Sequence, residues 1–535
     1  MPSHHTHSPA SGRSGHRHLA AALVVLCAAS LLGPGCSGET SPETGHGDAG
    51  SSAAGGGQGG VGGEAGSGGG HATCDDGTKN GGESDIDCGG DASGCPRCGL
   101  DQICTVPADC DSGVCLNGAC QPLPAGMTYF VAPDGDDASL EGDFDHPFAT
   151  LNQAWTVMAA GDIVYLRGGT YGLAVRQELQ GISGSAELPI RVWSYPNESP
   201  VLDGGALDDL AILQVWETSY LHVKGIRLTN LPQPHNPTTG YYGLLLFNDV
   251  THSIFERVET DHIGGWGVTI GDRCSDLLFL NCDSHHNADP YSNEPPSGGD
   301  PYGGSDGFET GSHGADATTD ITFKGCRAWS NSDDGWDLRQ ADGTFVLDGC
   351  WSFWNGYIPD TAVAGGNGDG FKLGGKTAPP TTDVLRTITR SLAFGNRGTG
   401  ITPEPDGADL ILGVAMLNCT AYDNAGDWGN GIASGGYGNV TTIRNCIAYS
   451  NHGADADITG LAIHDHNTFD LPLTVTDADF ASLDPTGMDG PRGTDGSLPV
   501  LDFLRLAPGS ALIDAGVDVG LPYESVAPDL GAFEH

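Results

Sequence analysis

Three short segments of the chain share an Asp-Gly pair followed by an aromatic residue. When they are aligned on the glycine, Asp306, Asp334 and Asp369 precede it in successive segments. Two residues beyond the glycine, the second segment has Asp337 and the third has Lys372. One pattern therefore presents a row of carboxylates beside an amine, which are residue types that bind a metal ion or exchange a proton.

The acids would meet if the three segments lay on successive coils of a solenoid. Neighbouring strands lie about 4.8 Å apart, so Asp306, Asp333, Asp334 and Asp337 would converge on one point. Carboxylates this close repel one another, and a hard divalent cation with about six to eight oxygen ligands relieves the repulsion. We therefore predict a calcium site formed by these four residues. The alternative is that the Asp-Gly pairs are only turn residues and the aromatics only core.

The elements that must position these residues belong to an internal repeat that begins at about Ser219. An anchor residue is followed five residues later by asparagine in each of six units. The anchors are Cys282, Cys326, Cys350, Ser391, Cys419 and Cys446, and the asparagines are Asn287, Asn331, Asn355, Asn396, Asn424 and Asn451. Short strands at this period suit stacked coils that bury their inward residues. The predicted fold class is all-β, a right-handed parallel β-helix.

Two of the coils are longer than the rest. They span 44 and 41 residues between anchors, against 24 to 28 in the others. The extra residues are 288–305, the first insertion, and 356–368, the second insertion, and both fall between an asparagine and the next strand. Insertions on one side of a solenoid commonly mark its binding face.

The two ends of the solenoid need covers, because open strand edges pair with other chains. Apolar residues at helical spacing predict a capping helix from about Phe148 to Ala160, followed by a strand at Asp162–Leu166. We expect the C-terminal segment, Ala527–His535, to close the other end.

The repeated cysteines have two possible states. Inward cysteines on stacked coils pack as small apolar groups, and we favour free, buried thiols. A disulfide between Cys326 and Cys350 is the alternative, because the spacing of adjacent strands lies within disulfide range.

A cysteine-dense stretch, residues 74–120, precedes the solenoid. It has eight cysteines among Asp, Gly and Asn residues, and we predict a small disulfide-rich module. Its cysteines are Cys74, Cys88, Cys95, Cys98, Cys104, Cys110, Cys115 and Cys120. The pair at Cys95 and Cys98 suggests half a zinc site as an alternative, but no second pair follows at zinc-ribbon spacing. The stretch resembles Cys-rich repeats of myxobacterial surface proteins, which implies a spacer or binding module.

The first 73 residues have the composition of an export signal and a linker. A short apolar run, Leu19–Leu32, follows two arginines, which predicts a signal peptide over residues 1–36. The run ends near Cys36 in a pattern that resembles the bacterial lipobox, so lipidation there is one expectation and a plain secretory signal the other. Residues 37–73 are rich in Gly and Ser and predict a flexible linker. We expect a protein at the outer-membrane surface or outside the cell.

The net charge of the chain is −47, with 22 Lys and Arg against 69 Asp and Glu. No extended basic face is available for phosphate contacts, which argues against nucleic acid as a partner. The acidity also favours bound calcium, with simple solubility as the alternative. We expect a monomer whose only membrane contact would be a lipid anchor at Cys36.

The segments "SDGFET", "SDDGWDLR" and "GDGFKLGG" resemble polysaccharide lyase family 9, the pectate-lyase-like right-handed β-helix family. The resemblance covers roughly Tyr129–His535, within the predicted catalytic domain at residues 127–535. It implies a calcium-dependent lyase of acidic polysaccharides such as pectate. Its calcium ligands would be Asp306, Asp333, Asp334 and Asp337, and its Brønsted base would be Lys372.

The chemistry of β-elimination agrees with these residue types. The reaction needs a base for the proton α to the uronate carboxylate and a cation that neutralises this carboxylate. Lys372 has a high ordinary pKa, and calcium would lower it while the acids raise it.

Two other functions remain open from the sequence. A glycoside hydrolase on the same fold would use paired carboxylates, for which Asp334 and Asp369 are candidates. A surface protein with calcium as a structural brace would need no catalysis, since the fold alone does not decide function.

Overall fold

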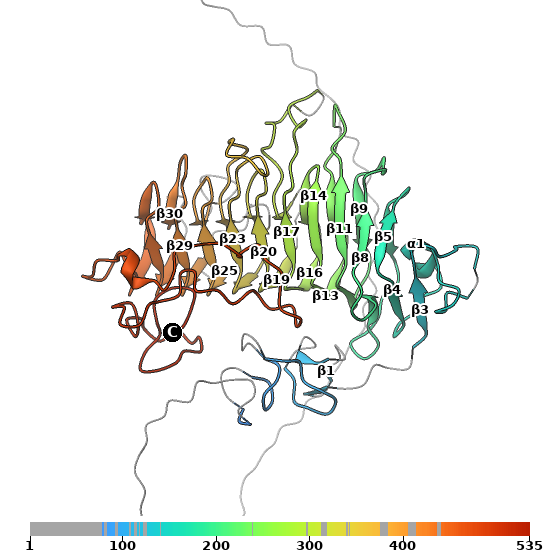
Figure 1. Ribbon diagram of the computed structural model, residues 1–535, viewed down its shortest axis with the longest axis horizontal. Helices are drawn as coiled ribbons and strands as arrows, with labels where there is room; N and C mark the ends of the chain where they lie inside the picture. Colours follow the sequence, from blue (N-terminus) through green and yellow to red (C-terminus); the bar gives the residue numbers. More distant parts are fainter. Residues whose placement is uncertain are drawn as a thin grey trace, which may run out of the picture. The chain divides into compact units, whose positions relative to one another are not determined.

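The computed structural model describes residues 77–79, 83–90, 95–105, 109–111, 115–116, 118–120 and 126–535, apart from 140, 238, 296–297, 312–317, 339–340, 342, 375–383, 405–412 and 436–439. The predicted signal peptide 1–36 with Cys36, the linker 37–73 and Cys74 lie outside these residues. From Thr128 onward, the described chain winds through three sheets coil by coil (Figure 1). Strands within each sheet pair in parallel, so the predicted parallel β-helix is confirmed.

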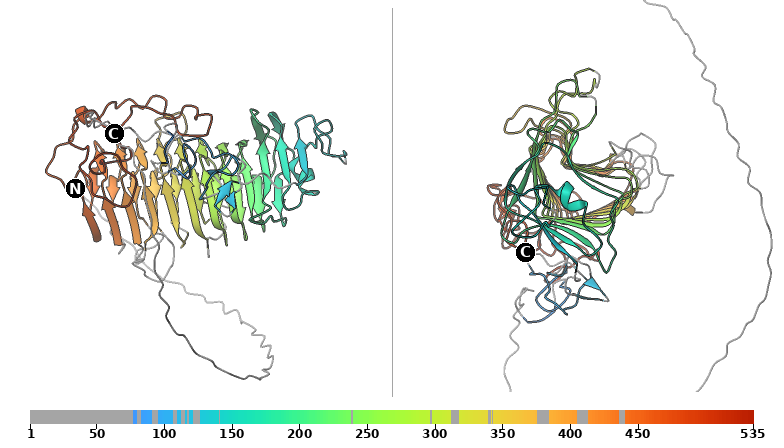
Figure 2. Two further views of the ribbon diagram at one scale, coloured as in Figure 1. Left: turned by 90° about the horizontal axis from the view of Figure 1, so that it is seen from below. Right: turned by 90° about the vertical axis from the view of Figure 1, so that its right-hand side faces the viewer.

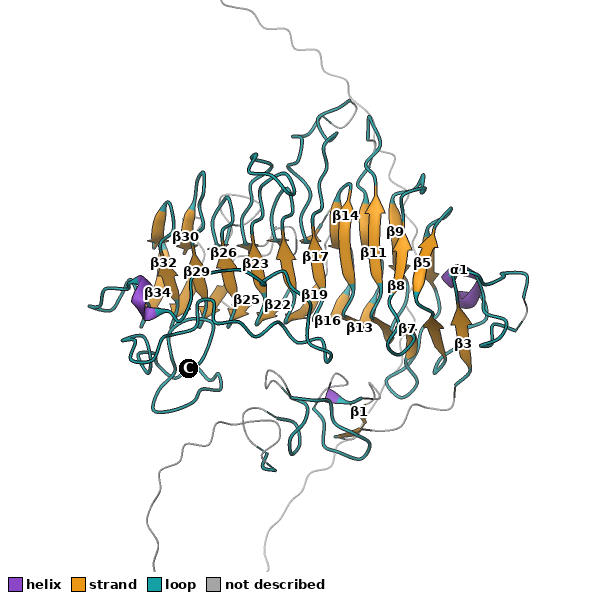
Figure 3. Cartoon of the chain, in the orientation of Figure 1, coloured by secondary structure: helices purple, strands orange, loops and turns teal. Residues whose placement is uncertain are grey.

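The three sheets run side by side along the solenoid (Figures 2 and 3). The first sheet consists of β3 (Thr128–Val131), β4 (Ile163–Leu166), β7 (Ile190–Ser194), β10 (Leu221–Lys224), β13 (Thr251–Glu256), β16 (Ser275–Leu280), β19 (Thr319–Lys324), β22 (Phe345–Asp348), β25 (Val384–Thr389), β28 (Gly413–Leu417), β31 (Val440–Arg444) and β34 (Leu461–Asp465). The second consists of β5 (Gly169–Gly172), β8 (Pro200–Asp203), β11 (Arg227–Leu231), β14 (Glu259–Ile263), β17 (Asp283–His285), β20 (Arg327–Trp329), β23 (Trp351–Phe353), β26 (Leu392–Phe394), β29 (Thr420–Tyr422) and β32 (Ile447–Tyr449). The third consists of β6 (Gln177–Gln180), β9 (Ala211–Trp216), β12 (Tyr242–Phe247), β15 (Trp266–Ile270), β18 (Phe308–Thr310), β21 (Trp336–Asp337), β24 (Phe371–Lys372), β27 (Ile401–Thr402), β30 (Asn430–Ala433) and β33 (Ala454–Asp457).

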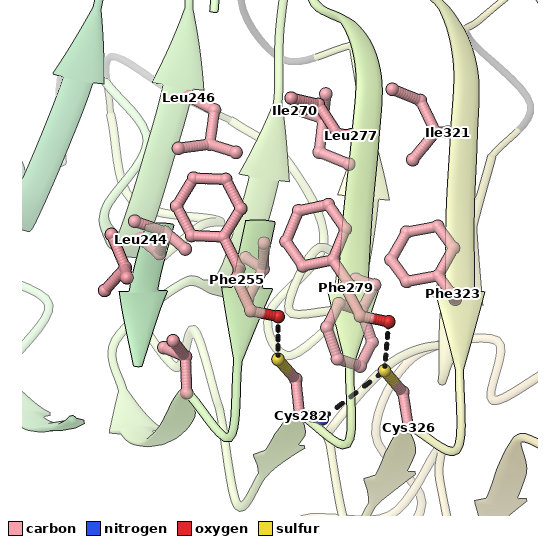
Figure 4. Packing of buried hydrophobic residues seen from close by; sticks show 14 of the residues in the cluster. Leu244, Leu246, Phe255, Ile270, Leu277, Phe279, Cys282, Ile321, Phe323 and Cys326 are labelled. Atoms are coloured by element: carbon pink, nitrogen blue, oxygen red, sulfur yellow. Dashed lines mark hydrogen bonds between the residues drawn. The ribbon is translucent and has the colours of Figure 1, made fainter. Parts of the chain in front are cut away.

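Stacks of identical side chains fill the inside of the coils. Phe255, Phe279 and Phe323 lie on adjacent strands of the first sheet, with ring centroids 5.2 and 4.9 Å apart (Figure 4). The Cys282 thiol donates to the Phe255 carbonyl over 3.1 Å, and Cys326 donates to Phe279 over 3.3 Å. The anchor cysteines are therefore free, buried thiols as predicted, and the alternative disulfide between coils is not formed.

The asparagines form a buried ladder at the bend after the second sheet. The Asn287 amide donates to Asn331 over 2.8 Å, and Asn331 donates to Asn355 over 3.0 Å. The same contact continues from Asn355 through Asn396 and Asn424 to Asn451. Each side chain also accepts from a backbone N–H of the neighbouring coil, as Asn355 does from Asn331. The ladder satisfies polar groups that burial would otherwise leave unpaired.

The capping helix is shorter than predicted. Helix α1 is Leu151–Trp155, and its first turn is capped by the Thr150 hydroxyl, which accepts from Gln153 N. Phe148 is extended instead, because its backbone pairs with β3 through hydrogen bonds to Phe130 and Ala132. The buried side of α1 joins the solenoid core, which is how it covers the first coil. The predicted strand is β4 and begins one residue later, at Ile163.

The C-terminal segment does not close the far end of the solenoid, which corrects the expectation from sequence. Gly531 N donates to the Asn445 carbonyl, and Ala532 N donates to the Thr420 hydroxyl, so this segment lies along the flank of the second sheet. Further upstream, Phe480 and Phe503 pack in the same apolar cluster as the outer residues of β20, β23 and β26. The C-terminal stretch packs there because the outer face of the second sheet is apolar, and its burial removes apolar surface from water. The same stretch includes a short 3₁₀ helix, Asp477–Asp479.

The N-terminal module is held by disulfides within the described residues. Cys88 bonds to Cys98, Cys104 to Cys115, and Cys110 to Cys120. Its only described sheet pairs β1 (Cys115–Leu116) with β2 (Ala119–Cys120) antiparallel. Because Cys98 is disulfide-bonded, the zinc alternative at the Cys95–Cys98 pair fails. None of the helices in the described part of the chain is long and apolar enough to cross a membrane.

Candidate active site

The third sheet places the predicted acids and the lysine in one column. Glu309 on β18 pairs with Asp337 on β21, and Asp337 pairs with Lys372 on β24. Alternation within each strand turns the preceding aromatics, Phe308 and Trp336, into the core, where their rings stack 4.9 Å apart. The inward stack therefore sets the register, and the register brings the charged residues together on the outer side of the sheet.

Three of the four predicted metal ligands form a compact, buried group. Carboxylate oxygens of Asp306, Asp333 and Asp334 lie within 4.8 Å of one another, and the side chains are 3%, 7% and 0% exposed. Asp334 N donates to Asp306 Oδ1 over 2.9 Å. The fourth, Asp337, is not a member of this group, and its Oδ2 lies 3.5 Å from Lys372 Nζ.

The charges in this group are costly without a cation. Burial raises the pKa of Asp306 well above its usual range, and the carboxylates of Asp333, Asp334 and Asp337 raise it further. Burial and Asp334 likewise raise the pKa of Asp333. The carboxylates repel one another when they are all ionised, and a hard divalent cation bound by their oxygens would offset this repulsion. Calcium prefers such oxygen ligands, so the residues present fit calcium.

Lys372 is buried among these acids and is 1% exposed. Its Nζ makes a short ion pair with Asp334 and lies 4.0 Å from Asp369 Oδ2. Burial lowers the pKa of Lys372, but the carboxylates of Asp334, Asp337 and Asp369 outweigh it and hold the pKa well above the usual range. The ion pairs of Lys372 are therefore buried and do not lie at the protein surface. It is a charged group whose protonation depends on the charge of the acids around it.

Both insertions reach the same acids. Tyr302 in the first insertion accepts from the Ser332 hydroxyl, and Gly366 N in the second donates to the Ser332 carbonyl. Asp333 accepts a backbone hydrogen bond from Asn367 and a longer one, 3.3 Å, from Gly368. The two long loops therefore converge at the acid group, as their position on one side of the solenoid predicted.

Asp369 and Trp266 also contact the acid group. Asp369 N donates to Asp334 Oδ1 over 2.6 Å, and burial together with the Asp334 charge raises the pKa of Asp369 to about 8. Trp266 donates its indole N–H to Asp306 Oδ2 over 3.1 Å. The sequence analysis did not identify Trp266. Its signal is the Trp266-Gly267 step, which aligns with Asp306-Gly307 when the preceding coil is included.

The chain is similar to several known proteins. Residues 129–430 match the model of the Pel9A-like, right-handed beta helix region. Pectate lyase L of Dickeya dadantii is 30% identical, and the match covers 81% of this chain and 96% of that one. Pectate lyase PEL9 of Emericella nidulans is 27% identical over 73% of this chain and 95% of the other.

Solved structures show the same relationship. The crystal structure of pectate lyase Pel9A has a TM-score of 0.60 and 30% identity, and the match covers 77% of this chain and 97% of that chain. A rhamnogalacturonan lyase has a TM-score of 0.59 and 25% identity, over 71% and 97% of the two chains. The fold is thus a right-handed parallel β-helix of the polysaccharide lyase class. The chain belongs to the Pel9A-like family, polysaccharide lyase family 9.

Proposed function

We propose that the protein cleaves an acidic, uronate-containing polysaccharide by calcium-dependent β-elimination. The relatives described above are pectate lyases and a rhamnogalacturonan lyase, which supports this substrate class. In this proposal Asp306, Asp333, Asp334 and Asp337 hold calcium, and Lys372 is the catalytic base.

One observation carries the proposal. Lys372 stands in register with Asp337 on the next strand, and its Nζ contacts Asp334 inside the buried acid group. A single amine is therefore held beside the oxygen ligands of one candidate metal site. A glycoside hydrolase would need no such amine, since it acts through two carboxylates.

The chain's own residues would perform the reaction as follows. Lys372 Nζ takes the proton from C5 of the uronate, the C–H electron pair becomes the C4–C5 double bond, and O4 leaves with the released chain and takes a proton from water. Calcium, when bound, offsets the charge of the four carboxylates, lowers the pKa of Lys372 and neutralises the carboxylate of the uronate. Asp334 and Asp337 fix the position of Nζ, because they contact it from the preceding coil.

We also propose the domain organisation and location. Residues 127–535 would be the catalytic domain, the module at 74–120 a spacer, and residues 1–36 an export signal with lipidation at Cys36. The disulfides of the module support an oxidising compartment outside the cytoplasm. The enzyme would act as a monomer at the outer-membrane surface or outside the cell.

The proposal is tested by incubating the purified protein with polygalacturonate or rhamnogalacturonan, with calcium or with a chelator. We expect absorbance of a conjugated, unsaturated product only when calcium is present. Reducing ends without unsaturation would instead favour the hydrolase alternative with Asp334 and Asp369. Calcium binding without cleavage of any acidic polysaccharide would favour the structural-brace alternative.

A further inference from the structure

A small cavity lies between the first insertion and the loop before β12, next to the acid group. Its volume is about 180 Å³. Its lining residues are Gln233, Pro237, Thr239, Gly240, Tyr241, Gly264, Gly265, Trp266, Asp289 and Ser292. Pockets for drug-sized ligands hold about 300–1,000 Å³, so this cavity has the scale of one sugar unit.

The cavity shares a wall with the candidate active site. Trp266 lines it and donates its indole N–H to Asp306 Oδ2. Asp289, in the first insertion, accepts from Tyr302 N through its backbone carbonyl, and the Tyr302 carbonyl accepts from the hydroxyl of Ser332, the residue before Asp333. A polysaccharide that places a uronate at the acid group would therefore place a neighbouring unit at this cavity.

Among the buried side-chain polar atoms of the described residues that line the cavity, one has no hydrogen-bond partner. Ser292 donates to Asp289 Oδ2 and accepts from the Gln233 amide over 3.1 Å. Gln233 Oε1 in turn accepts from Tyr291 N. Asp289 Oδ1 has no hydrogen-bond partner among the described residues, although the side chain is only 3% exposed. A buried carboxylate oxygen without a donor costs free energy, so it points to a ligand that supplies one.

The lining also selects the charge of that ligand. None of the described residues that line the cavity is a lysine, arginine or histidine. Burial raises the pKa of Asp289 to about 6, which leaves it ionised above neutral pH. A uronate carboxylate here would meet a like charge with no cation to offset it. A hydroxyl group would donate to Oδ1, while the half-buried rings of Tyr241 and Trp266 offer apolar surface to a sugar ring.

We propose that this cavity is a sugar subsite that binds an uncharged unit next to the uronate at which the chain is cut. The inference rests on the proposed lyase function and narrows its substrate. A polysaccharide with uncharged units among its uronates would be preferred over a continuous polyuronate. The uncharged unit has two possible sources, a neutral sugar in the backbone or a methyl-esterified uronate.

The test compares kcat/KM at pH 8 on three substrates by formation of unsaturated product. They are a rhamnogalacturonan backbone with alternating neutral sugars, partly methyl-esterified polygalacturonate, and fully de-esterified polygalacturonate. We expect the wild-type enzyme to favour the first or the second, and the favoured one identifies the source. In Asp289→Asn we expect the preference over the de-esterified polymer to fall about tenfold or more, because the charge that separates the substrates is gone.

Asp300→Asn is the matched control, since Asp300 is an exposed acid in the same insertion. It should leave the preference unchanged. An unchanged preference in Asp289→Asn, with its melting temperature intact, would overturn the subsite. If Asp289→Asn does not fold, Tyr241→Ala decides, and we expect it to lower kcat/KM on the favoured substrate by about fivefold.

A binding measurement separates failure of the subsite from failure of the lyase proposal. In Lys372→Ala protein with calcium, titration calorimetry would compare tetragalacturonate with a rhamnose–galacturonate tetrasaccharide and with a methyl-esterified tetragalacturonate. Tighter binding of the second or the third, lost on adding Asp289→Asn, supports the subsite without turnover. Equal binding of all three by the Lys372→Ala protein would overturn it. Absence of unsaturated product from every substrate with wild-type enzyme would instead overturn the lyase proposal.

Discussion

The outer faces of the second and third sheets differ sharply although the same repeat builds both. On the second sheet, the outward positions hold aromatics such as Phe353 and Phe394, which the C-terminal stretch covers. On the third sheet, the outward positions hold Glu309, Asp337 and Lys372. Inside the coils, both sheets present small or apolar residues to one continuous core. In the described coils, the inward residues and the covered aromatics of the second sheet contribute stability, whereas the outer face of the third sheet presents the residues of the candidate site.

Among the substitutions that test this difference between the two faces, replacement of Lys372 should have the largest effect, and the effect should be on catalysis. We expect Lys372→Ala to lower kcat by about 10² to 10⁴ with little change in melting temperature, because the variant loses the proposed base and keeps the apolar core. Lys372→Arg should fail nearly as badly, since a guanidinium stays protonated. The measurement is the initial rate of unsaturated product formation at saturating calcium.

The control for this prediction is a half-buried lysine outside the candidate site. Lys224 lies on the first sheet, 3.3 Å from Glu256. Lys224→Ala should leave kcat within about twofold, because Lys224 contacts none of the acids of the site. Near-normal turnover in both Lys372 variants would contradict the proposed base and favour the hydrolase alternative.

Removing one carboxylate of the acid group should weaken calcium binding. We expect Asp334→Asn to raise the calcium Kd by at least about tenfold, since the number of ligand charges sets the affinity. Activity should fall with it at limiting calcium, and titration calorimetry measures the binding itself. Thr399→Ala, in the same column one coil beyond Asp369, should change neither quantity. Unchanged calcium affinity in Asp334→Asn would rule out the site as proposed.

Truncating an aromatic on the covered face of the second sheet should lower stability and leave calcium binding unchanged. Phe353 is fully buried between Trp329 and Phe394, with ring centroids 5.6 and 4.8 Å away. Phe353→Ala should lower the free energy of unfolding by about 3–5 kcal/mol, because it removes a large buried side chain. Urea unfolding measures this loss. The calcium Kd of the folded variant should stay within about twofold of the parent, and a larger change would show that the two faces are coupled.

The ion pairs between the second sheet and the C-terminal stretch should make the free energy of unfolding depend on pH. Asp283 on β17 contacts Arg327 and Arg492, and Arg492 belongs to the covering stretch. Despite its burial, the two guanidinium groups hold the pKa of Asp283 well below its usual range. A depressed carboxyl pKa stabilises the fold above the unfolded value of about 3.9, and this stabilisation is lost as pH falls below it.

Asp283→Asn should therefore flatten the acid side of the stability–pH curve. At pH 7 we expect it to cost about 1.5–3 kcal/mol, the range for a hydrogen bond to a charged group. Thermal melting between pH 3 and 7 measures both effects. If Asp283→Asn loses as much stability as the parent between pH 7 and pH 3, other carboxylates cause the loss of stability in acid.

Deleting the residues before Ala125 should have the smallest effect. The module at 74–120 is stabilised by its own disulfides, and the family match begins only at residue 129. Turnover per molecule should stay within about twofold. Loss of catalysis in a truncated protein that retains the circular dichroism and melting temperature of the solenoid would place the module in the site.

Much of the fold was readable from the spacing of a few residue types. Asparagine five residues after each anchor predicted the coils, and the ladder from Asn287 to Asn451 confirms them. The Gly-aromatic step predicted the register, because a slip of one residue would turn Phe308 or Trp336 out of the core. That register alone aligned Asp337 with Lys372, so the column of the candidate site followed from sequence.

Other features depended on contacts between residues far apart in the chain. The C-terminal stretch packs on the second sheet because Trp329, Phe353 and Phe394 form an apolar face together, which no single repeat reveals. The hydrogen bonds from Asn367 and Gly368 to Asp333 depend on where a long loop folds back. The free oxygen of Asp289 depends on two loops meeting around Trp266. Local periodicity determines what each coil buries, whereas the conformation of insertions and the packing of a non-repeating tail are decided only by tertiary contacts.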